Sequence, residues 1–192
     1  ILRNTAPKST GNKKYLLYQG AVNEGRGLEW LLPAMANVDA ELWICGEGNF
    51  SGECRRLITV YGLEKKVIMK GMLDPENLQL VTGQAYAGIN LVEPIGLNQV
   101  YSLANKFFDY MHAGIPQLTM DFPEYRRIND EFEIALLLKT LTPELISGAL
   151  NNLLGNEVLY SRMHANCRAA SSVYNWQLEE IKLKQFYNNI FA

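Results

Sequence analysis

The segment Ser102–Gly114 (SLANKFFDYMHAG) carries the side chains that best suit the binding of an anionic ligand. A helix over this segment, capped by Ser102, places Lys106 and Asp109 on one face because they are three residues apart. Asn105 then lies in the first turn. A helix N-terminus attracts anions, and a lysine beside it adds a full positive charge. The pattern makes Asn105, Lys106 and Asp109 candidates for binding a phosphorylated ligand, with an ordinary surface Lys–Asp pair as the alternative.

A second candidate region is the glycine-rich segment 20–27 (GAVNEGRG), which follows a short apolar run. Gly20 and Gly25 let the backbone approach a ligand closely and leave N–H groups free for a phosphate, with Arg26 as the charged partner. The spacing differs from the G-x-G-x-x-G pattern of dinucleotide-binding proteins. A flexible turn with one surface arginine is therefore the alternative.

Three further loops follow apolar runs and are weaker candidates for ligand contact. Gly46 and Gly48 form a turn that either passes near a ligand or only links a strand to a helix. Met72 follows the next run and offers backbone groups to the edge of a base. The nine residues 93–101 (EPIGLNQVY) form a loop longer than the usual ~2–6 residues, and long loops at the ligand end of a sheet tend to carry function. This loop contains one acid, Glu93.

The elements that must position these residues alternate along the chain. Short apolar runs that end at turn residues predict strands at Lys14–Gln19, Glu41–Cys45, Lys66–Lys70, Tyr86–Val92, Ile115–Thr119 and Glu133–Leu138. Helical patterns and capping residues predict helices at Leu28–Ala36, Ser51–Tyr61, Asp74–Thr82, Ser102–Ala113, Thr142–Leu154, Glu157–Ser172 and Trp176–Ile190. This alternation predicts an α/β fold with a doubly wound, Rossmann-like, mostly parallel six-stranded sheet and helices on both faces. Ligands bind such sheets at the carboxyl ends of the strands, where the candidate loops stand.

The composition excludes several other classes of protein. The chain has 192 residues, 48% of them hydrophobic and 20% charged, with a formal net charge of -2, which disfavours nucleic acid as a partner. Its three cysteines and two histidines lack metal-ligand spacing, so we expect no disulfide framework, no zinc site and a reducing compartment. His112 is a candidate base, but a lone histidine on a helix is more often structural. No apolar run approaches the ~20 residues that a transmembrane helix needs.

Taken together, these segments resemble the C-terminal, donor-binding domain of retaining glycosyltransferases with two Rossmann-like domains. These are the glycosyltransferase family 4 group, or glycosyl transferases group 1, of GT-B architecture. The resemblance runs from about residue 14 to residue 192. Its most specific part is SLANKFFDYMHAGIP, which resembles the family's PNK-[LF]-[FY]-EY-M-x-x-G-x-P segment. The other matching segments are Tyr18–Glu29, with Arg26 at a basic position that meets the donor phosphates, Leu42–Gly48 and Asp121–Arg127.

The family carries two glutamates that face the donor, and the resemblance assigns their positions here. The second glutamate contacts the ribose of the nucleotide, and its position is held by Asp109. The first contacts the transferred sugar, but Tyr101 stands at its place, eight residues before Asp109. The glutamate pair is therefore not intact, and Glu93 is a displaced candidate for the first member. The resemblance implies that Arg26 and Lys106 act as the catalytic cations, without a cofactor or metal.

The resemblance also implies a division of labour within a longer protein. It implies a UDP- or GDP-linked sugar as donor and an N-terminal acceptor-binding domain of the same protein. The chain alone should then bind donor weakly and transfer nothing. The resemblance further implies a bacterial, cytoplasmic hexosyltransferase that synthesises polysaccharide or glycolipid. It also implies peripheral contact of the full-length enzyme with the inner membrane.

Within the chain we expect one nucleotide-sugar-binding domain, with residues 1–13 as a linker remnant, 14–172 as the Rossmann-like core and 173–192 as a C-terminal helix. That helix contains large apolar residues such as Trp176 and Phe186. The resemblance implies that it crosses back to the partner domain, and the alternative is that these residues cover the sheet of this domain. Two rival functions remain open. One is a non-catalytic Rossmann-like module that senses a nucleotide or binds a partner, and the other is a nucleotide-sugar epimerase.

Overall fold

The computed structural model describes residues 14–191, so the predicted linker at residues 1–13 lies outside the described residues. All six strands form one parallel sheet in the order β3-β2-β1-β4-β5-β6. The strands are β1 (Tyr15–Gln19), β2 (Glu41–Cys45), β3 (Val67–Gly71), β4 (Ala87–Asn90), β5 (Gln117–Met120) and β6 (Ala135–Leu138). The strand order reverses between β1 and β4, as in a Rossmann-like sheet. The predicted fold class is confirmed.

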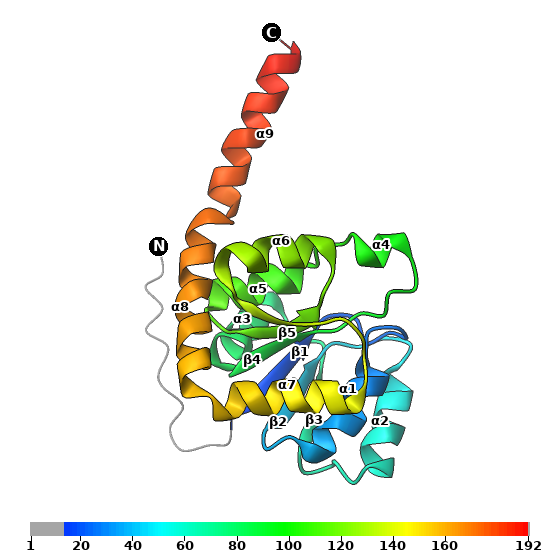
Figure 1. Ribbon diagram of the computed structural model, residues 1–192. Coiled ribbons are helices and arrows are strands. Elements are labelled where there is room, and N and C mark those ends of the chain that lie inside the picture. The colour runs from blue at the N-terminus through cyan, green and yellow to red at the C-terminus, as the bar shows by residue number, and fades with distance from the viewer. Residues whose placement is uncertain (1–13, 192) are drawn as a thin grey trace.

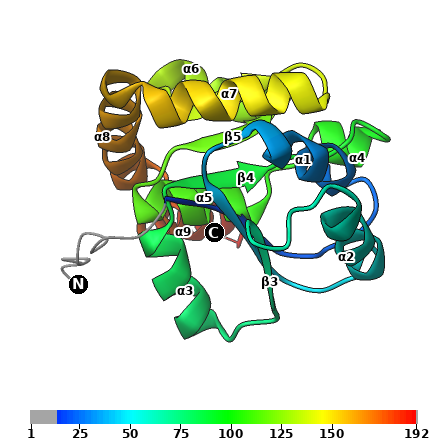
Figure 2. The same cartoon turned by 90° about the horizontal axis from the view of Figure 1, so that it is seen from below.

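Helices cover both faces of this sheet (Figures 1 and 2). They are α1 (Leu28–Ala34) with the 3-10 turn η1 (Met35–Asn37), α2 (Ser51–Val60), α3 (Pro75–Gln84), α4 (Leu97–Val100), α5 (Asn105–Ala113), α6 (Pro123–Phe132), α7 (Pro143–Gly155), α8 (Glu157–Val173) and α9 (Trp176–Phe191). Contacts join α1 to α2 and α7 on one face, and α3 to α5 on the other. Helix α8 packs against α5 and α6.

The central strand β1 contributes to the core on both sides of the sheet. Leu16 and Tyr18 belong to the cluster that includes Leu28 of α1, whereas Leu17 packs with Tyr110 of α5. Leu16, Leu17, Tyr18 and Tyr110 have no exposed surface, as expected for a parallel sheet covered on both faces. The free thiols of Cys45, Cys54 and Cys167 are also buried.

Several capping residues act as the sequence predicts. The Asp74 side chain accepts a hydrogen bond of 2.9 Å from the Asn77 N–H at the start of α3, and Pro75 is the first helical residue. Thr142 caps α7 in the same way, through the N–H of Leu145. Gly114 ends α5 with φ 75°, a left-handed conformation that favours glycine.

The segment before α5 differs from the prediction. Helix α5 begins at Asn105 rather than Ser102, because residues 97–100 form the separate short helix α4 within the predicted loop. The Ser102 hydroxyl donates to the Gln99 carbonyl, so it closes α4 instead of capping α5. Ala104 is the N-cap of α5 and provides no side-chain hydrogen bond. Ser51 is likewise the first residue of α2 rather than its cap, and its hydroxyl accepts from the Gly48 N–H.

Helix α6 was not predicted from the sequence. It begins with Pro123 at its first turn and buries Tyr125 and Ile128, one turn apart, against the core. Glu133 ends this helix with φ 46°, so the sixth strand begins at Ala135 and not at Glu133. The Asn129 side chain supports this turn by accepting from the N–H groups of Ile134 and Ala135.

The C-terminal helix α9 projects away from the body of the domain (Figure 1). It contains no buried residue, so the alternative in which it covers this domain's own sheet is wrong. Asn175 joins it to α8: its side-chain oxygen accepts from the Leu178 N–H, and its amide nitrogen donates to the Ser172 carbonyl. Within residues 14–191, no helix is both long and apolar enough to cross a membrane.

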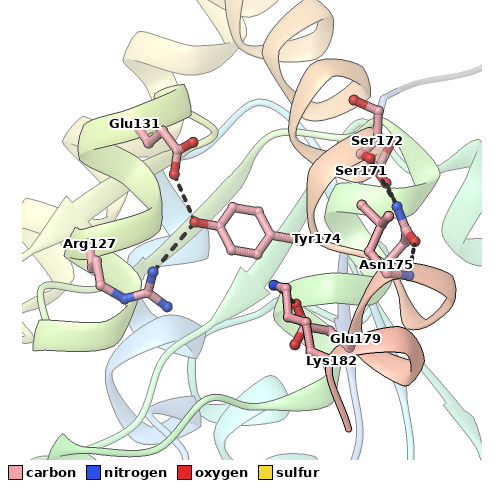
Figure 3. Close-up of polar contacts among 9 residues, drawn as sticks. Arg127, Glu131, Ser171, Ser172, Tyr174, Asn175, Glu179 and Lys182 are labelled. Atoms are coloured by element: carbon pink, nitrogen blue, oxygen red, sulfur yellow. Dashed lines mark hydrogen bonds and ion pairs between the residues drawn. The ribbon is translucent and has the colours of Figure 1, made fainter. Parts of the chain in front are cut away.

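Beside this junction, Tyr174 ties the end of α8 to α6 (Figure 3). Its hydroxyl donates to Glu131 at 2.8 Å and accepts from Arg127 at 3.4 Å. The direction in which α9 leaves the domain is therefore set by contacts of Tyr174 and Asn175 rather than by burial of α9 itself.

Candidate functional site

The candidate site lies where β1 and β4 separate at the carboxyl end of the sheet. Tyr110 of α5 fills the space beneath this point. Its hydroxyl accepts a hydrogen bond from the Gln19 N–H at 3.2 Å and lies 3.0 Å from the Leu17 carbonyl and 3.3 Å from that of Ile89. A carbon added at Gly88 would lie 2.2 Å from the Tyr110 ring, so this glycine lets α5 approach the sheet. Helix α5 is thereby fixed with its first turn at the strand-order reversal.

Lys106, in the first turn of α5, reaches across the end of β1. Its ammonium nitrogen lies 4.0 Å from the centroid of the buried Tyr18 ring, a cation–π contact. Its side chain also passes Gly20, where an added carbon would lie 3.5 Å from Lys106 Cε. The contact with Tyr18 shows that Lys106 is not the ordinary surface lysine that its spacing from Asp109 allowed.

The charge of Arg26 acts on Lys106 at this point. Burial, and next the charge of Arg26, lower the pKa of Lys106 to about 7, and Asp109 only partly opposes this shift. Across residues 14–191, no acid lies within ion-pair distance of Arg26. A diphosphate would relieve the repulsion between the two cations, because it carries the opposite charge. Arg26 therefore lies near enough to Lys106 for its charge to lower the pKa of the lysine.

Asp109 lies one turn further along α5 and lines a cleft between α3 and α5. The cleft has a volume of about 440 Å³ and is also lined by Gln19, Leu78, Thr82 and His112. The Gln19 side-chain amide donates a 2.9 Å hydrogen bond to Asp109 Oδ2. Burial raises the pKa of Asp109, while this hydrogen bond and the charges of His112 and Lys106 lower it. His112 therefore acts on Asp109 electrostatically from the same helix.

The glycines after β1 and β2 join the loops to one another. Gly20 donates its N–H to the Cys45 carbonyl, and Gly46 donates its own to Gly71. Gly46 has φ 148°, and an added carbon there would lie 1.9 Å from the Gly20 carbonyl oxygen. Gly48 donates to the Ser51 hydroxyl. The prediction that the glycine N–H groups of segment 20–27 are free for a phosphate is thus wrong at Gly20, because its N–H hydrogen-bonds within the protein.

The N–H group of Gly25, in the glycine-rich loop 20–27, is also hydrogen-bonded within the protein. Its N–H donates to Glu29 Oε1 at 3.1 Å, and its carbonyl accepts from the Glu93 N–H at 2.9 Å. A carboxylate from the first turn of α1 therefore occupies the place that the sequence assigned to a phosphate. By contrast, α5 has no side-chain cap, and its exposed first residue, Asn105, stands at a helix N-terminus open to an anion.

The loop after β3 borders a second cavity, of about 240 Å³, that adjoins the first at Leu78. Met72, with 74% of its surface exposed, lines it together with Gly20, Gly46 and Leu73. The two cavities adjoin, with Met72 lining the second and Asp109 lining the first. The structure thus places Gly20, Gly46 and Met72 around one cavity.

Glu93 is directed toward a different partner. Its carboxylate accepts a 2.9 Å hydrogen bond from the indole N–H of Trp30, on α1. Helix α1 covers the opposite face of the sheet from α5 and Asp109. The structure therefore does not bring Glu93 and Asp109 together as a pair of acids.

With this geometry in place, comparison with known proteins identifies the family. The model of the glycosyl transferases group 1 family matches residues 4–170. This chain belongs to that family. Membership favours a glycosyltransferase over the non-catalytic module that the sequence analysis left open. No curated protein sequence matches the chain significantly.

Solved structures of glycosyltransferases share the fold of this chain. Sucrose-phosphate synthase from Thermosynechococcus elongatus has a TM-score of 0.77 and 22% identity, over 94% of this chain and 46% of its own. Anabaena HepE, in complex with UDP and glucose, has a TM-score of 0.79 and 14% identity, over 93% of this chain and 49% of its own. The chain thus spans about half the length of these two proteins.

A third structure corresponds to a single domain. It is the C-terminal domain of the glycosyl transferase group 1 family protein LpcC from Francisella tularensis, with a TM-score of 0.70 and 13% identity. The match covers 84% of this chain and 85% of that one. At these identities the likeness concerns the fold.

Two residues of the site, Gln19 and Thr82, were not predicted from the sequence. Gln19 could have been predicted, because it is a polar residue at the end of an otherwise apolar strand. Thr82 lies within α3 and carries no such signal, because only the folded chain brings it to Gln19.

Proposed function

We propose that this domain binds a nucleotide-diphosphate sugar across the carboxyl ends of β1 and β4, and that its parent protein transfers the sugar to an acceptor. One observation carries the proposal: Lys106 lies across the end of β1, over the Tyr18 ring and one turn before Asp109, at the uncapped N-terminus of α5, and the charge of Arg26 reaches it. Cations and a helix N-terminus at one point match the charge of a diphosphate.

The chemistry of transfer explains why these charges matter. The donor leaves as a nucleoside diphosphate, and negative charge grows on it as the glycosidic bond breaks. Fixed positive charge aimed at the leaving group stabilises the transition state more than the ground state. We assign this role to Arg26 and Lys106, with the N–H groups near Asn105, so that a metal is not required. Retention of configuration and transfer of a hexose are assigned from the resemblance of Ser102–Pro116 to the family.

The remaining donor contacts follow from the two adjoining cavities. Asp109 is proposed to accept hydrogen bonds from the ribose hydroxyls, and the backbone at Met72 to border the base. Gly20, Gly25, Gly46 and Gly48 shape this surface through the loop contacts described above. UDP is favoured over GDP as the first donor to test, because Anabaena HepE and a pneumococcal O-GlcNAc transferase are similar structures in complex with UDP. Glu93 is proposed to fix the first loop, through Gly25 and Trp30, rather than to touch the sugar.

The acceptor side is proposed to come from an N-terminal domain of the same protein. Helix α9 supports this arrangement because its large apolar residues are exposed, among them Trp176 (63%), Phe186 (59%) and Phe191 (80%). Exposed apolar surface of this kind marks an interaction site, and we propose that the partner domain covers it. A bacterial enzyme of polysaccharide or glycolipid synthesis, working in the cytoplasm or at the inner face of the membrane, is the corresponding setting.

The test is nuclear magnetic resonance mapping of the donor site on the 192-residue chain. Titration with UDP-glucose should shift the amide signals of Gly20, Met72, Asn105 and Asp109, while signals of α7 stay unchanged. The same titration on Lys106→Met should lose most of these shifts. Shifts confined to other surfaces would place the nucleotide elsewhere and contradict the proposal.

A further inference from the structure

Gln19 is a polar side chain at the point where the donor is proposed to bind. It is the last residue of β1, and only 4% of its surface is exposed. A buried side-chain amide is costly unless its groups are hydrogen-bonded. Its partners therefore explain why it stands at the end of an apolar strand.

The Gln19 amide is hydrogen-bonded at both ends. Its nitrogen donates to Asp109 Oδ2 at 2.9 Å, and its oxygen accepts from the Thr82 hydroxyl at 2.8 Å. These contacts link β1, α3 and α5 in one row across the floor of the cleft between the two helices. Asp109 is the end of that row, and its carboxylate lines the cleft.

The charge of Asp109 fixes which way the amide points. With the amide reversed, its oxygen would face Asp109 Oδ2, so that two acceptors would meet without a proton between them. The Thr82 hydroxyl also lies 2.8 Å from the Leu78 carbonyl, so it has an acceptor in either arrangement. Thr82 thus tolerates both orientations, and the Asp109 carboxylate selects the one in which nitrogen faces it.

The hydrogen bond from Gln19 restricts the orientation of the Asp109 carboxylate. The torsion that turns an aspartate carboxylate is broad, so a free Asp109 would sample many orientations. The hydrogen bond from Gln19 engages Oδ2 and leaves Oδ1 for a ligand in the cleft. It also lowers the pKa of Asp109 against the effect of burial, which favours the carboxylate form.

We propose that Gln19 is a positioning residue that orients the Asp109 carboxylate toward the ribose hydroxyls of the donor, with Thr82 supporting it from α3. This inference rests on the proposed function. It predicts that Gln19 contributes to affinity only for nucleotides that carry the ribose hydroxyls.

The test measures the affinity of the 192-residue chain for UDP and for 2′,3′-dideoxy-UDP. GDP and 2′,3′-dideoxy-GDP are measured in parallel, and the variants are then compared with the nucleotide pair that binds more tightly. Gln19→Met keeps the length of the side chain and removes its hydrogen bonds, while Thr82 keeps the Leu78 carbonyl as partner. We expect Gln19→Met to weaken UDP binding about tenfold and to leave the dideoxy nucleotide unchanged. Thr82→Val should give a smaller loss of the same kind. Gln84→Met changes an exposed glutamine on α3 and should alter neither affinity.

Three other outcomes would overturn the inference, and they differ in what they say about donor binding. If the unmodified chain binds no nucleotide, the proposed function fails, and this inference fails with it. If the unmodified chain binds UDP and the dideoxy nucleotide equally, donor binding stands but the ribose contact does not, and the inference is overturned. If Gln19→Met weakens both nucleotides equally, or neither, then Gln19 only supports the fold.

Discussion

Replacement of Lys106 by methionine should stabilise the folded domain. Burial and Arg26 lower the pKa of this lysine from its ordinary 10.5 to about 7. At 1.36 kcal/mol per pKa unit, keeping the ammonium in the folded state costs up to about 4 kcal/mol at pH 7. Loss of the contact with the Tyr18 ring offsets roughly 1 kcal/mol of the gain. We therefore expect Lys106→Met to raise the free energy of unfolding by about 2–4 kcal/mol at pH 7.

The gain should depend on pH in a defined direction. Between pH 7 and 10.5 the unfolded chain holds the Lys106 proton and the folded chain has lost it. The unfolded state then binds more protons, so this group makes the folded protein more stable as the pH rises. The difference between Lys106→Met and the unmodified chain should therefore shrink from pH 7 to pH 9.5, by up to about 1.4 kcal/mol per pH unit.

Urea denaturation of both proteins at pH 7, 8.3 and 9.5 measures this difference directly. Taking the difference cancels other titrating groups, such as the thiol of Cys54, whose pKa burial raises to about 12. Lys70 provides a matched control, because it is an exposed lysine that lies 3.9 Å from the centroid of the Trp43 ring. Lys70→Met should change the unfolding free energy slightly and equally at each pH. A Lys106→Met protein that is less stable at every pH, or whose gain is flat with pH, would refute the reasoning.

Three further predictions follow from the geometry of the site and the C-terminal junction. Gly46→Ala should destabilise the domain by more than about 3 kcal/mol in urea denaturation, because the new carbon meets the Gly20 carbonyl oxygen. Gly52→Ala, in open space on α2, should instead stabilise the domain by about 0.5–1 kcal/mol. Equal effects of the two substitutions would contradict the role assigned to Gly46. Tyr110→Phe should cost about 1–3 kcal/mol in the same assay, because the Gln19 N–H loses its acceptor, and an unchanged stability would remove the role assigned to this hydroxyl. Asn175→Ala should speed hydrogen exchange at the Leu178 amide while leaving global stability unchanged, since α9 buries no residue; a fall in global stability would mean that α9 supports the fold.

The sheet could be predicted from the sequence because its signals are local. Each strand is a short apolar run, and runs such as Glu41–Cys45 stop at glycine, so the parallel α/β arrangement follows. Helix α6 could not be predicted as readily. Only Tyr125 and Ile128 of its ten residues are buried, and the rest are mainly charged or polar, so the segment is difficult to distinguish from a loop.

The candidate site was only partly predictable for a different reason. Lys106 and Asp109 share one helix, so their spacing already placed them together. The contacts that decide their chemistry come from β1, where Tyr18 lies under the ammonium and Gln19 holds the carboxylate. Glu93 shows the opposite case: it stands at the correct end of the sheet, but Trp30 binds it on the other face. Sequence spacing places residues at an edge, and packing across the sheet determines which of them meet.

The central claim is that a nucleotide donor binds at Lys106 and Asp109, at the carboxyl end of β1. Calorimetric titration of the 192-residue chain with UDP-glucose, repeated with Lys106→Met and with Asp109→Asn, tests it most directly. We predict measurable binding by the unmodified chain and a loss of about tenfold or more in affinity for each variant. Equal affinity in all three proteins, or no heat of binding with UDP- or GDP-linked sugars at millimolar concentrations, would contradict the claim.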